Sequence, residues 1–367
     1  MDIGITMTLF NDVLFSEEEA RQGFLGVMTL NKPQAYNALS HDMILHITEQ
    51  LDQWSRNKHL LTVIVRSDFE KAFCSGGDIR FLYDAGKKGD IAALRSFFCD
   101  EYKLIHRINT YPKPWVSFIN GITMGGGVGL SIHGHHRVAT ETLRFAMPEC
   151  AIGFFPDVGG SYFLSRCPGE LGTYLGLSGA SINAADALYC GLIDHCVVGG
   201  NYAAMKAQLL DTDFGKATDI HKAITAILKQ HAIQPENSAL AEKRELIDKY
   251  FQGDSIIRII CNLEQDASPW CQELAFNLQQ KSPLSLKVAL EQLRRGKNLT
   301  LDACLKMEYT IAQHFATAKD FYEGVRAQIV DKDKTPHWQP ATLAAVSDET
   351  VAAYFEVKDG LKLNEAS

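Results

Sequence analysis

Hydrophobic residues follow two alternating patterns in the first 200 positions of the chain. Short apolar runs at Gly23–Leu30, Leu61–Arg66 and Trp115–Ile119 are typical of buried strands, and the second run is rich in β-branched residues. Between the first two runs, apolar side chains recur at the spacing of one helix face from position 43 to 54, and Ser40 is placed to cap that helix. Strand, helix and strand with glycine-rich joints predict an α/β fold.

The pattern changes near residue 200. From there to residue 300 the chain is rich in Ala, Leu, Lys, Glu and Gln, and few strand patterns occur. Helical spacing predicts helices over Ile220–His231, Ser238–Phe251, Pro283–Arg295 and 299–329. Residues 332–340 predict an ordered but irregular arm. We therefore expect an α/β core over residues 1–200 and a mainly helical region over residues 201–367.

Composition and charge exclude several classes of partner. The chain has 367 residues, of which 46% are hydrophobic and 22% charged, as in globular proteins and unlike disordered ones. Its 36 Lys and Arg against 44 Asp and Glu give a net charge of −8, so we expect no nucleic-acid partner. The longest apolar runs fall far short of the roughly 18 residues that span a bilayer, so we expect no membrane association.

The N-terminus and the cysteines both bear on the compartment. The first twenty residues contain no basic segment and no arginine, which argues against a signal or transit peptide. The nine cysteines are odd in number, scattered in spacing and without a CxxC pair, which predicts free thiols in a reducing compartment. We therefore expect a cytoplasmic location, with a processed organellar protein as the alternative that would have the same sequence features.

The HGHHR stretch at 133–137 invites a metal interpretation. If it lies on a strand, neighbouring histidines point to opposite faces, and no Cys or carboxylate stands at a familiar ligand spacing. We therefore expect no metal site. Cys74 has no obvious base beside it in the sequence, so we expect a small buried residue rather than a nucleophile.

Three glycine-rich stretches carry the first hint of chemistry: FCSGGDI at 73–79, NGITMGGGVGL at 120–130 and FFPDVGGSYF at 154–163. Glycine runs that open helices present free backbone N–H groups, and two such groups aimed at one point form an oxyanion hole. Any one stretch alone is more often a turn. None fits a dinucleotide-binding loop, a P-loop or a G-x-S-x-G nucleophile elbow.

Two carboxylates lie in otherwise apolar sequence beside these stretches. Glu149 stands in FAMPECAIGFF and Asp157 in FFPDVGG. An acid in such surroundings is either a paired structural group or a group with a shifted pKa. Two of them between glycine loops favour general acid–base or nucleophilic work.

Taken in this order, FCSGGDI, NGITMGGGVGL, MPE and FPDVGG resemble the crotonase (enoyl-CoA hydratase/isomerase) superfamily. Further segments resemble one branch of it, the 3-hydroxyisobutyryl-CoA hydrolases. They are DEYKL with Glu101, RVAT at 137–140, SPLSLKV at 282–288 and DFYEGVRAQIVDKDKTPHWQP at 320–340. The resemblance covers about residues 23 to 340. It implies a fold made of a spiral of ββα turns, with a C-terminal helical part that covers the site or mediates oligomer contacts.

The resemblance also implies a site. The amides of Gly77 and Gly126 would form the oxyanion hole for a thioester oxygen, Glu149 and Asp157 would be the working acids, and Glu101 would line the substrate pocket. Hydratases of the superfamily carry a second glutamate three residues after the oxyanion glycine, where this chain has Gly129. This departure counts against hydration and agrees with the hydrolase branch.

The function that follows is hydrolysis of a short-chain 3-hydroxyacyl-CoA thioester, with 3-hydroxyisobutyryl-CoA in valine breakdown as the leading substrate. Glu149 would act as nucleophile or as general base, and both routes stay open. The alternatives are an enoyl-CoA hydratase or isomerase of the same fold and a non-catalytic acyl-CoA-binding subunit. No cofactor is expected, because coenzyme A is part of the substrate.

Coenzyme A carries phosphates, so a chain with a net charge of −8 needs local cations to bind it. Candidates are Lys32, Arg80 and Lys287, although any single cation is more often a solvated surface charge. Lys32 precedes the PQAYNALS loop, which contains Ala35 and resembles the adenine-binding loop of the superfamily. Because superfamily members often form trimers, the resemblance also allows a homo-oligomer.

Overall fold

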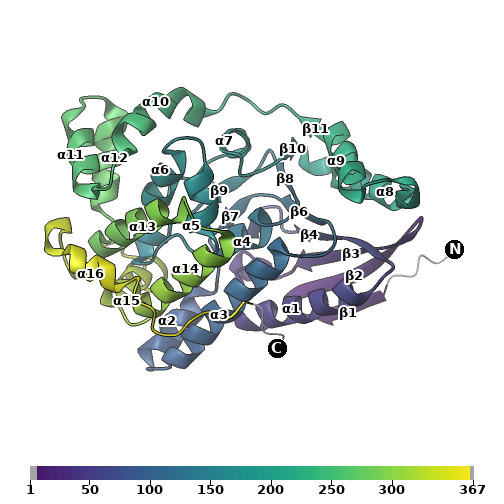
Figure 1. Ribbon diagram of the computed structural model, residues 1–367, viewed down its shortest axis with the longest axis horizontal. Helices are drawn as coiled ribbons and strands as arrows, with labels where there is room; N and C mark the ends of the chain where they lie inside the picture. Colours follow the sequence, from purple (N-terminus) through teal and green to yellow (C-terminus); the bar gives the residue numbers. More distant parts are fainter. Residues whose placement is uncertain (1–5, 364–367) are drawn as a thin grey trace. The chain divides into compact units, whose positions relative to one another are not determined.

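The chain divides into two units, each assembled from three separate stretches of sequence. Figure 1 labels the helices and strands and colours the chain from its N-terminus to its C-terminus. In the computed structural model we describe residues 6–363. The first unit comprises Met1–Gly77, Arg107–Phe145 and Ile182–Ala239, and the second comprises Asp78–His106, Ala146–Ser181 and Leu240–Ser367.

The first unit is organised around an eight-stranded sheet. In spatial order its strands are β1 (Thr6–Phe10), β2 (Val13–Ala20), β3 (Gly23–Leu30), β4 (Leu60–Ser67), β6 (Trp115–Ile119), β8 (His136–Thr140), β10 (His195–Val197) and β11 (Ala232–Ile233). The five strands from β3 to β10 run parallel, and β1, β2 and β11 add antiparallel edges. The three predicted strands are confirmed as β3, β4 and β6.

A second, three-stranded sheet accompanies the first. Its strands are β5 (Ala72–Cys74), β7 (Ile122–Met124) and β9 (Arg144–Ala146). Each follows directly on β4, β6 or β8, so each turn of the chain contributes one strand to the large sheet and one to the small sheet. Helix α4 (Gly126–Ile132) comes directly after β7. This repeat is the ββα spiral that the resemblance implies, and the predicted α/β fold class is confirmed.

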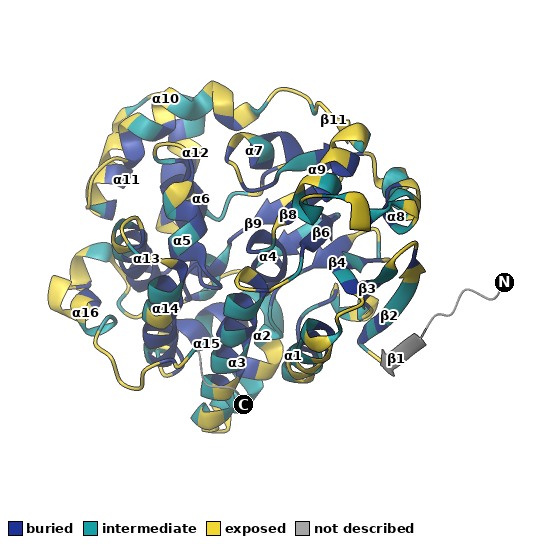
Figure 2. Ribbon diagram, turned by 45° about the vertical axis from the view of Figure 1, so that its right-hand side comes forward, coloured by how far each residue is buried: buried dark blue, intermediate teal, exposed yellow. Residues whose placement is uncertain are grey.

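Helices cover the large sheet of the first unit. Helix α1 (His41–Arg56) is the predicted helix, and the Ser40 side chain accepts a hydrogen bond from the Met43 amide as an N-cap. Helices α8 (Tyr202–Asp211) and α9 (Ile220–His231) share one apolar core with the strands, which includes Val27, Ile64, Val116, Val138, Met205, Leu209, Ile224 and Leu228. Figure 2 shows β6 and β8 largely buried.

The second unit is mainly helical. It contains α2 (Ile79–Lys87), α3 (Ile91–Asn109), α5 (Gly160–Phe163), α6 (Leu171–Ser178), α10 (Ala239–Phe251), α11 (Ile256–Gln265), α12 (Pro269–Gln279), α13 (Pro283–Gly296), α14 (Leu301–Phe315), α15 (Lys319–Val325) and α16 (Asp348–Ala353). The predicted helices near 220, 238 and 283 are confirmed, and the 299–329 pattern corresponds to α14, α15 and a π-helical turn. The division of the chain near residue 200 into an α/β core and a helical region stays a prediction. Helices α8 and α9, which follow residue 200, pack on the large sheet of the first unit.

The irregular arm at 332–340 is confirmed, and one arginine orders its start. The Arg326 guanidinium donates hydrogen bonds to the carboxylates of Glu323, Asp331 and Asp333. The Glu323 carboxylate also accepts from the His337 amide, at 2.8 Å. These bonds tie the arm to the end of α15 without a helix or strand of its own.

Two glycines let α15 approach the 3₁₀ turn Glu149–Ile152 closely. A Cβ atom on Gly324 would lie 2.3 Å from the Ile152 carbonyl carbon, and one on Gly153 would lie 2.0 Å from the Asp320 carbonyl oxygen. Neither position has room for a side chain. The glycine of the EGVRA segment is therefore needed for this contact, which supports the turn that carries Glu149.

Candidate active site

Two glycine-rich loops of the first unit lie side by side. A Cβ atom on Gly76 would stand 3.7 Å from the Gly126 nitrogen and 3.3 Å from the Met124 carbonyl oxygen. Gly76 has a φ of +114° and Gly125 a φ of +46°, conformations that glycine adopts without strain. The stretches at 73–79 and 120–130 therefore form neighbouring loops.

The amides predicted to bind the thioester oxygen belong to these two loops. Gly126 is the first residue of α4, so its amide has no partner within the helix. Within residues 6–363 we find no acceptor for the amide of Gly126 or of Gly77. Two unpaired amides on adjoining loops are what an oxyanion hole requires. The oxyanion role itself stays a prediction.

The loop predicted to bind adenine is held by a buried asparagine that the sequence analysis missed. The Asn37 Oδ1 atom accepts from the Lys32 amide at 2.8 Å, and Nδ2 donates to Ser67 Oγ at 2.7 Å and to the Phe73 carbonyl at 3.0 Å. Asn37 is fully buried and has a φ of +56°. It therefore fixes the turn that carries Lys32 and Ala35, a conformation for which asparagine is well suited.

The same turn runs beside the first glycine loop. The Leu39 amide donates to the Gly76 carbonyl at 2.8 Å, and the Ser75 amide donates to the Tyr36 carbonyl at 2.9 Å. The Lys32 ammonium stands 3.8 Å from the Asp12 carboxylate. The predicted adenine-binding loop and the loop that carries the Gly77 amide are therefore joined by hydrogen bonds within the first unit.

The three predicted carboxylates all belong to the second unit, and all are buried. Glu101 lies on α3, Glu149 begins the 149–152 turn, and Asp157 lies in the loop before α5. Their exposed fractions are 3%, 6% and 6%. Aromatic rings of Phe98, Phe154, Phe155, Phe315 and Phe321 pack together around the same segments.

Burial and mutual repulsion make these acids hard to ionise. Burial raises the pKa of Glu149 well above its usual value, and the charge of Asp157 raises it further. The same two causes raise the pKa of Glu101. Burial raises the pKa of Asp157 to about 7, although a hydrogen bond from Tyr102 opposes the rise. The structure thus brings the three predicted acids into one electrostatic group.

Two oxygens of this group have no hydrogen-bond partner. Oε1 of Glu101 and Oε2 of Glu149 are buried and unpaired within the described part of the chain. An unpaired buried polar atom costs on the order of 1–3 kcal/mol, so such atoms call for an explanation. A ligand hydroxyl or an attacking water would satisfy both oxygens.

Two further residues of this group escaped the sequence analysis. The Tyr102 hydroxyl donates to Asp157 Oδ2 at 2.8 Å, and Tyr102 is fully buried. Glu308 on α14 has no exposed surface and accepts hydrogen bonds from the loop after Asp157. In the sequence Tyr102 is one aromatic among many, and Glu308 lies in an ordinary amphipathic helix, so no local pattern singles them out.

The remaining predicted cations are engaged elsewhere in the second unit. Arg80 is exposed on α2 and pairs with Asp84 at 2.9 Å. Lys287 on α13 donates to the Val346 carbonyl at 2.5 Å and lies 4.0 Å from the Asp348 carboxylate. Lys287 also lines a cavity of about 460 Å³ with Arg295 and residues of α16. Coenzyme A binding by Lys32, Arg80 and Lys287 stays a prediction.

The histidine stretch and the cysteines take ordinary positions. The His135 and His136 rings lie beside that of His221, and burial lowers the pKa of His136 to about 4. Among the described residues no group of three or more His, Cys, Asp or Glu side chains is arranged to hold a metal ion. All nine cysteines are free thiols, and Cys74 is buried, as predicted. No helix within residues 6–363 is long and apolar enough to cross a bilayer.

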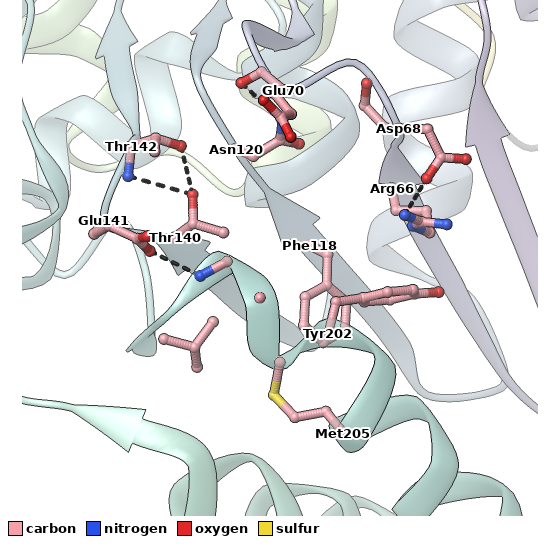
Figure 3. A pocket seen from close by; sticks show the side chains of 14 residues that line it. Arg66, Asp68, Glu70, Phe118, Asn120, Thr140, Glu141, Thr142, Tyr202 and Met205 are labelled. Carbon is pink, nitrogen blue, oxygen red and sulfur yellow. Dashed lines mark hydrogen bonds and ion pairs between the residues drawn. The ribbon is translucent and has the colours of Figure 1, made fainter.

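A cavity of about 460 Å³ in the first unit contains none of the predicted site residues (Figure 3). Several of its charged groups have partners within the first unit. Arg66 pairs with Asp68 and lies 4.0 Å from the centre of the Tyr202 ring, and Glu141 accepts from the Gly199 amide at 2.8 Å. We assign no role in catalysis to this cavity.

The sequence of the chain matches a known protein family over most of its length. The family model described as enoyl-CoA hydratase/isomerase matches residues 25–355. The chain belongs to the enoyl-CoA hydratase/isomerase family. This confirms the crotonase resemblance and places the glycine loops and the carboxylates within one family domain.

Individual proteins of known name are similar to this chain over most of its length. The chain is 42% identical to the mitochondrial 3-hydroxyisobutyryl-CoA hydrolase of Danio rerio, over 95% of this chain and 90% of that protein. It is 43% identical to the mitochondrial 3-hydroxyisobutyryl-CoA hydrolase of Gallus gallus, over 92% and 87%. Among solved structures it is similar to a carnitinyl-CoA dehydratase from Mycobacterium thermoresistibile, at 37% identity, 99% coverage of both chains and a TM-score of 0.86.

These names correct one prediction. The cytoplasmic location expected from the sequence is wrong by this comparison, because the curated relatives are named as mitochondrial proteins. The expectation rested on the lack of basic residues in the first twenty positions and on the pattern of the nine cysteines, and neither feature decides the compartment.

Proposed function

We propose that this chain hydrolyses a short-chain 3-hydroxyacyl-CoA thioester, with 3-hydroxyisobutyryl-CoA as its substrate. The products are 3-hydroxyisobutyrate and free coenzyme A, a step of valine breakdown. The observation that carries the proposal is the buried group of Glu149 and Asp157, with an unpaired Glu149 oxygen, in a chain about 40% identical to hydrolases of that name.

The two glycine loops supply the electrostatic part of the proposed reaction. The thioester carbonyl oxygen accepts hydrogen bonds from the Gly77 and Gly126 amides. These bonds strengthen as negative charge develops on the oxygen in the transition state. A donor of this kind contributes about 3 kcal/mol to transition-state stabilisation. This oxyanion hole is part of the proposal and rests on the unpaired state of both amides.

Glu149 supplies the oxygen chemistry by one of two routes. As a nucleophile its carboxylate attacks the carbonyl carbon, the C–S bond breaks, and water then hydrolyses the mixed anhydride. As a general base it takes a proton from water, the hydroxide attacks, and the proton passes to the departing thiolate. A raised pKa suits the second route, because it makes the ionised carboxylate a stronger base.

In this proposal Asp157 recognises the 3-hydroxyl of the acyl group through a hydrogen bond. An acid that is buried and already bonded to Tyr102 can accept a hydrogen bond from a substrate 3-hydroxyl. Substrates without that hydroxyl leave a buried polar group unpaired, which is strongly penalised. Glu101, which also has an unpaired buried oxygen, would line the substrate pocket in this proposal.

Hydration is the alternative from the same fold, and the similar dehydratase structure makes it worth testing. The sequence of helix α4 argues against hydration. Its sequence, GGVGLSI, contains no acid, and Gly129 occupies the position where the resemblance to hydratases requires a glutamate. With only one of the two water-activating carboxylates, the chain is poorly equipped to add water to a double bond.

The test is release of free thiol from 3-hydroxyisobutyryl-CoA, followed with a disulfide dye. We expect fast release that Glu149→Gln reduces by at least 10³-fold, while binding of coenzyme A is retained. Crotonyl-CoA serves as the parallel substrate. Loss of its chromophore without thiol release would mean hydration and would refute the proposal. Unchanged turnover in Glu149→Gln would remove Glu149 from the mechanism, whereas binding of coenzyme A without any thiol release by the parent chain would favour a binding subunit.

We further propose that the reaction needs no cofactor, since water, the substrate and the residues named above supply every group. Thiol release after dialysis against EDTA should equal that of the untreated protein. An acyl-CoA is the partner that the family membership supports. A homo-oligomer stays a prediction.

A further inference from the structure

A buried carboxylate of the second unit has no place in the reaction proposed above. Glu308 lies on α14, its side chain has no exposed surface, and its backbone partners Gly159 and Ser161 stand 149 and 147 residues earlier in the chain. Buried carboxylates are rare unless they are paired or carry out a task. No cation pairs with Glu308 within the described residues.

Glu308 instead binds the backbone that follows Asp157. Its Oε2 atom accepts from the Gly159 amide at 2.7 Å, and Oε1 accepts from the Ser161 amide at 2.9 Å and from Ser161 Oγ at 2.6 Å. Three donors converge on the two oxygens. Backbone amides that hold an anion in this way form one of the strongest arrangements a carboxylate can find in a protein.

A second side chain fixes the direction of these bonds. The Gln292 amide nitrogen on α13 donates to Ser161 Oγ at 2.8 Å and to the Pro156 carbonyl at 2.5 Å. Because Ser161 Oγ accepts from Gln292, its own proton is free to point at Glu308. The loop from 156 to 161 is thus held on both sides of Asp157.

The loop needs holding because its backbone is strained. Val158, the residue after Asp157, has a φ of +51°, a region that β-branched residues strongly avoid. Val158 is fully buried, so the strain persists only because the surroundings impose it. Such strain costs on the order of 1–3 kcal/mol and relaxes when the imposing contacts are lost.

We propose that Glu308 is a positioning residue of the thioesterase reaction, which holds the Val158–Ser161 backbone and so fixes where the Asp157 carboxylate stands. The inference rests on the proposed function. In this inference α13 and α14 support the carboxylate of Asp157, which lies far before them in the sequence. Burial raises the pKa of Glu308 to about 8, the hydrogen bonds from Ser161 and Gly159 oppose this rise, and the charge of Asp157 adds to it.

The first test is Glu308→Gln. The amide keeps the size of the side chain but replaces one acceptor oxygen by an NH₂ group, so one buried backbone N–H loses its partner. We expect kcat for the 3-hydroxy thioester to fall about 10- to 100-fold, the loss that a misplaced reacting group brings, with KM little changed. Amide exchange at Gly159 and Ser161 should quicken in the same variant.

A double-mutant cycle separates positioning from a general structural role. If Glu308 acts through Asp157, adding Glu308→Gln to Asp157→Asn should cause no further loss of kcat. Losses that multiply in the double variant would overturn the inference. So would an unchanged kcat, or unchanged amide exchange, in Glu308→Gln. A parent chain without thioesterase activity would refute the proposed function, and this is measured before any variant is made.

Two further variants guard the result. Asp186→Asn is the matched control, since Asp186 is a buried carboxylate that accepts from Ser238 Oγ at 2.7 Å in the first unit, and it should leave kcat unchanged. Ser161→Ala removes one donor but keeps the Glu308 charge, so it should lose less activity than Glu308→Gln. If Glu308→Gln does not fold, the same cycle is run with Ser161→Ala, and multiplying losses there refute the inference.

Discussion

Replacing Asp157 by asparagine should make the protein more stable while lowering kcat. Asp157 is buried, and burial raises its pKa from 3.8 to about 7. At pH 8 the carboxyl is therefore ionised in surroundings that favour its neutral form. Asparagine has nearly the same shape, stays neutral, and can still accept the hydrogen bond from the Tyr102 hydroxyl. The substitution thus removes a charge that folding has to bury.

The magnitude follows from the pKa shift. A shift of about 3 units corresponds to about 4 kcal/mol of unfolding free energy at pH 8. Since the folded-state pKa lies above that of the unfolded chain, the stability linked to this carboxyl is present below pH 4 and is lost as the pH rises through 7. At pH 5 the penalty is therefore only about 2 kcal/mol. For a chain of this length, 4 kcal/mol corresponds to a Tm rise of about 5 °C.

The assay is thermal unfolding of the parent and of Asp157→Asn at pH 5 and pH 8. Asp194→Asn is a control of opposite sign. Burial raises the pKa of Asp194, but the hydrogen bonds and charge of Arg137 outweigh this effect and lower the pKa. Asp194→Asn should therefore lose stability at pH 8. A Tm of Asp157→Asn at or below that of the parent at pH 8 would refute the reasoning, as would a gain independent of pH.

Three other substitutions test the site from different directions. Tyr102→Phe removes the hydrogen bond that lowers the Asp157 pKa. The acidic limb of the pH profile of kcat should therefore move to higher pH. A limb that stays in place would show that this hydrogen bond does not set the pKa of Asp157. Gly324→Ala places a methyl group 2.3 Å from the Ile152 carbonyl carbon, so we expect a loss of about 1–3 kcal/mol in denaturant unfolding and a lower kcat; parent-like values would mean that α15 does not support the turn. Asn37→Ala frees the predicted coenzyme A loop, so KM should rise by at least tenfold with kcat little changed, whereas an unchanged KM would separate this loop from coenzyme A binding.

Elements with a strong local pattern were predictable from the sequence. The buried strand Gly23–Leu30 and the helix Ile220–His231 begin and end where their hydrophobic patterns do. Ser40 is a cap because a short polar side chain there satisfies a free amide, which is a local matter. The glycine loops were also predictable, because only glycine tolerates the positive φ of Gly76 and Gly125.

The partners of the buried acids were not predictable. Glu308 and Tyr102 reach Asp157 or its loop from distant helices, and nothing in their own neighbourhoods distinguishes them from core or surface positions. The compression between Gly324 and Ile152 likewise depends on how two remote segments meet. Helix α9 shows the same limit, because its amphipathic pattern predicts a covered face without saying which sheet covers it.

The distance in sequence between Gly159 and Glu308 also has a consequence for synthesis on the ribosome. The two residues are 149 positions apart, so at about 5–20 residues per second the Asp157 loop waits roughly 7–30 s for the carboxylate that holds it. During that interval the strained Val158 backbone lacks its anchor, and the nascent enzyme has no complete acid group. A transcript broken between codons 157 and 308 therefore yields a chain that has every predicted catalytic residue but lacks the carboxylate that holds the Asp157 loop.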